Sequence, residues 1–132
     1  MSKRRQPERA EQAHIVRLLR TLGSDVWTLG TTRRRSDYQG TNQAPGLPDL
    51  LAFLPASDGG RVLLVVEVKA SGGRLRPDQV RFRDCCRAAG IAHVTGGVDA
   101  VIAWLLDHGY LKPEHVAHYR LPQEAPHAVS HP

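Results

Sequence analysis

The sequence predicts a mixed α/β domain in which a four-stranded sheet is flanked by helices. Three features support this fold class: a helical stripe near the N-terminus, two apolar runs joined by a turn, and alternating helical and extended patterns after them. The predicted order is helix, strand, strand, strand, helix, strand, helix. A chain of 132 residues, 41% hydrophobic and 23% charged, suits one folded domain rather than two.

The first helix is predicted over residues 8–22, between Pro7 and Gly23, which are typical of helix ends. Residues 26–29 predict a short strand, and the polar segment 30–46 predicts a long loop. The helix over residues 8–22 is predicted from an apolar stripe with spacings of three and four residues, which consists of Ile15, Leu18, Leu19 and Leu22.

Two apolar runs, residues 49–54 and 61–69, surround a turn-rich segment and predict a β-hairpin. The second run is apolar at nearly every position, which is typical of a central strand buried on both faces. If the turn is centred on Asp58, the hairpin places Asp49 directly opposite Glu67.

The second half of the chain predicts a helix from Pro77 to Gly90, a strand over residues 91–94 and a helix over residues 98–108. We expect the domain to span residues 1–110. Residues 111–132 are rich in Pro and His and predict a tail that is poorly ordered or loosely docked. The inward face of the helix that begins at Pro77 is predicted to carry Gln79, Phe82, Cys86 and Ala89.

The net charge of +5 is concentrated in residues 1–40, which carry nine basic and four acidic side chains. A basic segment suits phosphate contacts through Coulomb attraction and counterion release. No apolar run approaches the length of a membrane span, and no apolar signal segment follows the basic N-terminus, so we expect a cytoplasmic protein. The adjacent Cys85 and Cys86 favour neither a disulfide nor a metal site, and we expect them on a partly buried helix.

Three charged residues interrupt or end the apolar strands: Asp49, Glu67 and Lys69. Opposed Cβ atoms in a hairpin are roughly 4.5–5.5 Å apart, and residues two apart on a strand share a face, so the three side chains converge. Two carboxylates this close repel unless a cation binds them. Oxygen ligands without Cys or His suit Mg²⁺, for which Mn²⁺ can substitute, and the backbone carbonyl of Val68 is a further candidate ligand.

Such an ion would polarise a phosphodiester and activate water, while Lys69 would orient or deprotonate that water or stabilise charge on the phosphate. The alternative is an exposed Lys–carboxylate cluster of little energetic consequence. Gly46-Leu47-Pro48 favours the site, since Pro48 fixes the backbone at the entry to Asp49. A zinc site among the seven histidines is disfavoured, because those near the tail lack Cys partners and a rigid scaffold.

Pro48-Asp49 followed by Glu67-Val68-Lys69 across a hairpin resembles the PD-(D/E)XK signature of restriction and repair nucleases. The chain is more closely similar to the VRR-NUC family (virus-type replication-repair nucleases) over about residues 8–110. The resemblance implies a restriction-endonuclease-like core and a Mg²⁺-dependent nuclease of DNA repair or replication. The segments that carry it are Gly46-Leu47-Pro48-Asp49-Leu50, Glu67-Val68-Lys69, Gly73-Arg74-Leu75, Pro77-Asp78-Gln79 and Ala88-Ala89-Gly90.

The resemblance also implies roles for individual residues. Asp49 and Glu67 would bind the metal, Lys69 would be the catalytic lysine, and Gln79 would be the helix glutamine that supports the active centre. The family carries an acidic residue in its first helix, for which Glu8 and Glu11 are both candidates. Glu8 has the family-like spacing of four residues before Gln12 and is preferred, while Glu11 lies closer to the apolar stripe and stays open.

DNA contacts are expected from two basic groups. Arg33, Arg34 and Arg35 lie in the long loop and are interpreted as a phosphate clamp. Trp27 is expected in the core, although it and Tyr38 are the residues that would stack on exposed bases. The second basic group surrounds the start of the helix at Pro77 and consists of Arg74, Arg76, Arg81 and Arg83.

The expected function is therefore a metal-dependent endonuclease that acts on branched DNA, with no membrane partner and no small-molecule cofactor. Short family members without extra domains resemble Holliday-junction resolvases, which implies a homodimer in the cytoplasm of a bacterial or phage-infected cell. Three alternatives remain: a non-catalytic module that binds branched DNA, a nuclease acting on ordinary duplex, and a protein with no nucleic-acid role.

Overall fold

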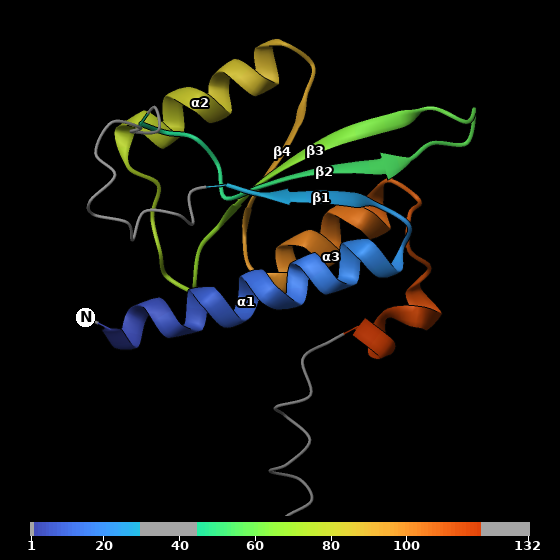
Figure 1. The fold of residues 1–132 in the computed structure, drawn as a ribbon, viewed down its shortest axis with the longest axis horizontal. Coiled ribbons are helices and arrows are strands. Elements are labelled where there is room, and N and C mark those ends of the chain that lie inside the picture. The colour runs from blue at the N-terminus through green and yellow to red at the C-terminus, as the bar shows by residue number, and fades with distance from the viewer. Residues whose placement is uncertain (1, 30–44, 120–132) are drawn as a thin grey trace, which may run out of the picture.

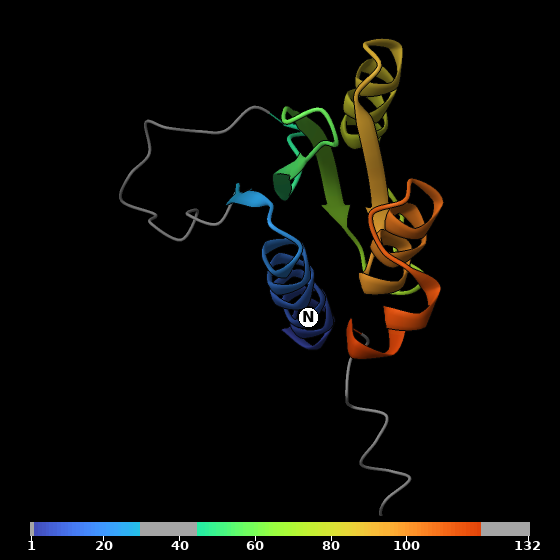
Figure 2. The same ribbon diagram turned by 90° about the vertical axis from the view of Figure 1, so that its right-hand side faces the viewer.

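The computed structural model describes residues 2–29 and 45–119, with side chains from residue 8 onward. A mixed sheet lies at the centre, with helices α1 and α3 on one face and α2 on the other (Figures 1 and 2). The predicted fold class and element order are confirmed. The elements are α1 (Ser2–Thr21), β1 (Asp25–Thr28), β2 (Leu50–Pro55), β3 (Arg61–Val68), α2 (Pro77–Ala88), β4 (Ala92–Gly96), α3 (Val98–Asp107) and the 3₁₀ helix η1 (Pro113–Tyr119).

The sheet has the strand order β1-β2-β3-β4. The first three strands are antiparallel neighbours, while β4 runs parallel to β3 after the crossover through α2. Leu50 pairs with Val66, which is the register that places Asp49 across from Glu67, one step beyond the start of β2. Residues 64–68 of β3 are all buried, so the prediction of a central strand covered on both faces is confirmed.

The main core fills the space between the sheet and helices α1 and α3. It forms because the helical stripe and one set of alternate strand residues meet there. The fully buried members of this core include Ile15, Leu19, Leu50, Leu54, Leu64, Val66, Val101, Ile102 and Leu105.

No helix within the described ranges 2–29 and 45–119 is long and apolar enough to cross a membrane.

The structure differs from the predicted element bounds by more than one residue in three places. Helix α1 begins at Ser2 rather than residue 8, so Pro7 lies inside the helix instead of marking its start. Helix α2 ends at Ala88, which leaves Ala89 exposed at the C-cap rather than on the inward face. Strand β4 continues to Gly96, two residues further than expected.

The packed body also extends past residue 110, where the domain was predicted to end. Leu111 is buried in the main core, and Val116 and Tyr119 of η1 pack against it. A ring nitrogen of His14 lies 2.6 Å from the carbonyl oxygen of Tyr119 and links η1 to α1. These apolar residues follow neither a helical nor a strand period, so the sequence pattern did not reveal them. The rest of the predicted tail, residues 120–132, lies outside the described residues.

Candidate active site

Backbone hydrogen bonds hold Asp49 in place at the open end of the β2–β3 hairpin. Its N–H donates to the carbonyl of Val66 at 3.2 Å, and its carbonyl accepts from the N–H of Leu29 at 2.8 Å. Its side chain is fixed as well, since Oδ2 accepts a hydrogen bond from the N–H of Val68 at 2.8 Å. The carboxylate is therefore held against the end of β3, where Glu67 is only 4% exposed.

The two carboxyl groups interact strongly. Burial, the negative charge of Asp49 and a hydrogen bond with that residue together raise the pKa of Glu67 from its usual value of 4.5 to about 8. The positive charges of Lys69 and Arg76 act in the opposite direction, so both lie near enough to interact with the carboxylate. Without a cation, the pair favours a state in which Glu67 keeps its proton.

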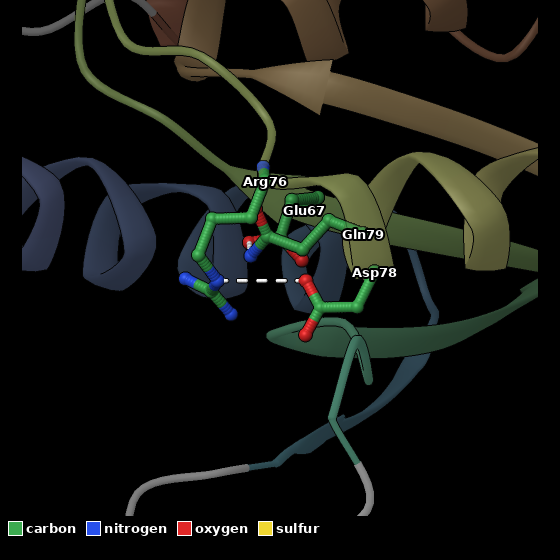
Figure 3. A network of polar contacts seen from close by, with 4 residues as sticks. All are labelled: Glu67, Arg76, Asp78 and Gln79. Atoms are coloured by element: carbon green, nitrogen blue, oxygen red, sulfur yellow. Dashed lines mark hydrogen bonds and ion pairs between the residues drawn. The ribbon is translucent and has the colours of Figure 1, made fainter.

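Gln79 holds Glu67 from the neighbouring helix (Figure 3). Its Nε2 donates to Oε2 of Glu67 at 2.9 Å, and its Oε1 accepts from the backbone N–H of Arg76 at 2.8 Å. Both ends of this buried amide are thus satisfied, which fixes its orientation. The inward position predicted for Gln79 is confirmed.

The segment before Asp49 packs tightly against the start of α2. Gly46 has a φ of +91°, and a Cβ there would come within 2.5 Å of the carbonyl oxygen of Asp78. Only glycine permits this approach. Pro48 is also buried. Gly46 therefore packs against α2, the helix that carries Gln79. The same helix thus contacts both the segment that leads to Asp49 and, through Gln79, the side chain of Glu67.

Lys69 follows directly after β3, and its N–H donates to the carbonyl of Gly96 at 3.1 Å. The chain then turns back, so that Gly73 lies against the side chain of Lys69. Oε2 of Glu8 accepts a long hydrogen bond of 3.4 Å from the N–H of Ala70. Glu8 therefore lies beside the segment that carries Lys69.

Glu11 points to a different place. Its Oε1 accepts a 2.6 Å hydrogen bond from the N–H of Val98, the first residue of α3. A Cβ at Gly97 would collide with this carboxylate. Glu11 thus caps the positive end of a helix, which is a structural use of an acidic residue. Of the two acidic candidates in α1, Glu8 contacts the segment that carries Lys69, whereas Glu11 contacts the start of α3.

The donor set suits a hard divalent cation. Asp49 and Glu67 offer carboxylate oxygens, and Val68 offers a backbone carbonyl between Glu67 and Lys69. Within the described part of the chain, no three His, Cys, Asp or Glu side chains gather in a metal-binding cluster. Water or substrate oxygens would therefore complete the coordination, as is usual for Mg²⁺. Burial of Glu67 and the charge of the half-buried Asp49 raise the pKa of Glu67, and a cation bound between the two carboxyl groups would relieve their repulsion.

Comparison with known proteins identifies the family of this chain. A model of the VRR-NUC domain matches residues 5–99, a range that includes every acidic, lysine and glutamine candidate described above. The chain belongs to the VRR-NUC family. It therefore carries the PD-(D/E)XK nuclease fold of DNA-processing enzymes. A solved structure described as a VRR_NUC domain is 28% identical to this chain, with a TM-score of 0.57. That match covers 77% of this chain and 96% of the solved one, and no curated protein matches.

The arginine candidates of this VRR-NUC chain fall into distinct groups. Arg74 and Arg76 are exposed, the charge of Arg76 acts on Glu67, and Arg76 forms a 3.5 Å ion pair with Asp78 (Figure 3). Arg81 is exposed further along α2, whereas Arg83 pairs with its neighbour Asp84 at 3.2 Å. The predicted clamp of Arg33, Arg34 and Arg35, and also Tyr38, lie outside the described residues.

The expectation that Trp27 belongs to the core is wrong. Its side chain is 56% exposed on the edge strand β1, where the ring of Phe53 supports it edge-on. A four-residue strand does not reveal which of its faces a helix covers, so no local pattern predicted this exposure.

Two of the tertiary contacts that were not predicted differ in the signal that the sequence carried for them. The close approach of Gly46 to Asp78 and the capping of Val98 by Glu11 join residues far apart in sequence. A hint existed for the first, because a glycine before Pro48 is compatible with a strained turn. No local signal existed for the second, since Gly97 at the N-cap supplies no side chain of its own.

Proposed function

We propose that this protein is a metal-dependent DNA endonuclease that hydrolyses phosphodiester bonds. The observation that carries the proposal is the contact between the Asp49 and Glu67 carboxyl groups, with the charge of Lys69 close enough to act on Glu67. Placing two acids together costs stability when one of them, here Glu67, is buried, and such a cost is typical of a site that a function requires. Binding DNA alone does not require them, so this cost favours catalysis over a non-catalytic binding module.

Each side chain has a role that follows from its position. Asp49 and Glu67 bind Mg²⁺ or Mn²⁺ with the carbonyl of Val68, and the ion supplies Lewis-acid polarisation of the phosphodiester. Lys69 orients the attacking water or stabilises negative charge that develops on the phosphate. Gln79 keeps Glu67 in one orientation through its buried hydrogen bond. Glu8 steadies the backbone that follows Lys69.

Phosphate binding is assigned to Arg76, which is exposed and whose charge acts on Glu67, and to Arg74, which is exposed two residues before it. We extend it to Arg33, Arg34 and Arg35 on their sequence alone. The preferred substrate is branched DNA cut by a homodimer, which rests on analogy with short junction-resolving nucleases. In this proposal the enzyme works in the cytoplasm of a bacterial or phage-infected cell.

The deciding experiment compares cleavage of a labelled four-way junction, a flap and a linear duplex in Mg²⁺, Mn²⁺ and EDTA. Metal-dependent, symmetric cutting of the junction is the expected result. Equal cutting of all three substrates would keep the chemistry and remove the branch preference. Failure of folded protein to cut any substrate would contradict the nuclease proposal.

Two variants sharpen that experiment. Lys69→Ala should abolish cleavage while folding and DNA binding stay close to wild type, and retained turnover would remove Lys69 from the mechanism. Asp49→Asn should weaken metal binding, which isothermal calorimetry measures without DNA. Unchanged metal affinity in Asp49→Asn would contradict the ligand assignment.

A further inference from the structure

Trp27 exposes an indole ring close to the candidate active site. Among the described residues, two large hydrophobic side chains are exposed: Trp27, and Leu47 at 37%. The ring centroids of Trp27 and Phe53 are 5.6 Å apart and the ring planes are at 88°, so Phe53 supports the indole on one side. A supported aromatic ring with a solvent-facing surface is a candidate stacking platform.

The pairing of the strands places Trp27 on the face of the sheet that carries the two carboxyl groups. Trp27 is opposite Leu51, and Leu51 is opposite Val65. Asp49 and Glu67 each lie two residues from one of these partners and so project from the same face. With about 3.4 Å per residue and 4.8 Å between strands, the Cα atoms of Trp27 and Asp49 are separated by about 8 Å.

This face is only partly covered. Helix α2 packs against β4 on this side, and α1 and α3 lie on the opposite side (Figure 2). The part formed by β1 and β2 keeps Phe53 and Leu51 half-buried and leaves Trp27 exposed. Positive charge stands nearby, since Lys69 and Arg76 both act on Glu67.

The size of the patch favours a nucleobase over a second protein chain. A stable dimer buries about 800 Å² on each partner. Just over half of one indole offers on the order of 100 Å², because a whole aromatic side chain buries about 150–250 Å². One base stacks on that area, and nearby cations suit the phosphates on either side of it.

We propose that Trp27 stacks on an unpaired base of the DNA substrate, one to three nucleotides from the phosphate that is cut. The position of that phosphate rests on the proposed nuclease function. The range follows from the separation of about 8 Å and a spacing of about 3.4 Å per nucleotide in a stacked strand. Bases inside a perfect duplex have no free ring face, so the substrate class is DNA with unpaired bases beside the cleavage point.

Fluorescence tests the stacking without any cleavage. The chain has two tryptophans, and Trp104→Phe leaves Trp27 as the single indole emitter. This variant is titrated in EDTA with single-stranded DNA, a bulged duplex and a perfect duplex. We expect quenching of Trp27 by the first two and little by the third. Quenching without later cleavage in Mg²⁺ would support the stacking and count against the nuclease.

Binding measurements give the second readout. Trp27→Ala should weaken binding of the bulged duplex by about 5- to 100-fold and leave the perfect duplex within about twofold. Trp27→Phe should recover part of the loss, and Leu47→Ala, which shortens the other exposed apolar side chain, should bind as wild type. Circular dichroism checks that each variant folds.

Three results would overturn the proposal. One is an equal loss of affinity for bulged and perfect duplex in Trp27→Ala, which would indicate a general surface contact. Another is cleavage of bulged DNA with no quenching, which would leave the nuclease proposal intact. The third is a loss of self-association in Trp27→Ala, seen by sedimentation, with DNA binding unchanged, which would assign the patch to a second copy.

Discussion

The amide of Gln79 donates a 2.9 Å hydrogen bond to Oε2 of Glu67 and accepts one from the backbone of Arg76. One buried side chain thus links a proposed metal ligand on β3 to the first turn of α2. Residues that orient a metal ligand typically contribute 10- to 100-fold to activity. The link therefore predicts an effect of Gln79 on catalysis even though the residue need not touch the substrate.

We expect Gln79→Ala to reduce kcat by about 10- to 100-fold while DNA affinity stays near wild type. The freed carboxylate of Glu67 would also bind metal less well, so the Mg²⁺ concentration for half-maximal rate should rise. Single-turnover cleavage over a range of Mg²⁺ concentrations measures both quantities. A kcat within twofold of wild type and an unchanged Mg²⁺ dependence would contradict this role.

The raised pKa of Glu67 predicts how the stability of the metal-free protein depends on pH. In the unfolded chain Glu67 ionises near 4.5, whereas the folded protein keeps the proton until about pH 8. The folded state thus binds this proton more tightly. The proton on Glu67 therefore stabilises the folded state. This stabilisation is fully present below pH 4.5 and is lost as pH rises through about 8.

Thermal melts in EDTA should therefore show Tm falling across this range, more steeply for wild type than for Glu67→Gln, whose amide cannot ionise. Mg²⁺ should raise the Tm of wild type most at high pH, because binding displaces the proton. Parallel Tm curves for wild type and Glu67→Gln would show that Glu67 does not titrate in this range.

The sequence predicted those features of the site that depend on local periodicity. The hairpin register that opposes Asp49 and Glu67 follows from the two-residue period of strands and the position of the turn. The inward direction of Gln79 follows from the helical period of its apolar neighbours. Each of these periods is complete within about twenty residues, so the sequence contains the information.

The features that escaped prediction depend on contacts between distant segments. Whether Trp27 is covered depends on where α2 lies over the sheet, which the four residues of β1 do not encode. The choice between Glu8 and Glu11 required the positions of Ala70 and Val98, which these acids contact. Tertiary packing therefore determines contacts of Trp27, Glu8 and Glu11 that spacing alone left open.

The close approach of Gly46 to α2 predicts a stability loss with an internal control. Gly46 and Gly59 have nearly equal φ values of +91° and +90°, so an alanine costs roughly 1–2 kcal/mol of backbone strain at either position. A Cβ at Gly59 meets nothing within 4 Å, whereas one at Gly46 meets the Asp78 carbonyl.

Gly46→Ala should therefore lower the free energy of unfolding by about 1–3 kcal/mol more than Gly59→Ala, as overpacking does elsewhere. Urea denaturation of both variants measures the difference. Cleavage by folded Gly46→Ala should also fall, because the segment leading to Asp49 must shift. Equal stability losses for the two variants would mean that the backbone at Gly46 is free to relax.

Glu8 and Glu11 predict opposite effects from changes three residues apart. Glu11→Ala removes the side-chain acceptor at the start of α3 and should cost about 1–2 kcal/mol of stability, with cleavage by the folded fraction retained. Glu8→Gln keeps the size of the side chain but weakens its support of Ala70. It should lower cleavage and leave the unfolding free energy within about 0.5 kcal/mol.

The measurements are urea denaturation and cleavage at matched concentrations of folded protein. A result in which Glu11→Ala abolishes cleavage and Glu8→Gln does not would exchange the roles assigned to the two acids. Reduced cleavage in both variants, with stability unchanged, would place both residues in the site.

Arg74 and Arg76 predict the salt dependence of DNA binding. Each phosphate contact contributes about 0.9 to the slope of log affinity against log salt concentration for B-DNA. Changing both to alanine should therefore flatten the slope by about 1.8, measured by fluorescence anisotropy with labelled duplex from low to moderate salt.

Arg61 is the matched control, because it is equally basic but lies at the start of β3, away from the carboxylates, and pairs with Asp25 at 3.9 Å. Arg61→Ala should leave the slope unchanged. Should the double variant keep the wild-type slope while Arg61→Ala flattens it, the DNA would lie at the opposite end of the sheet.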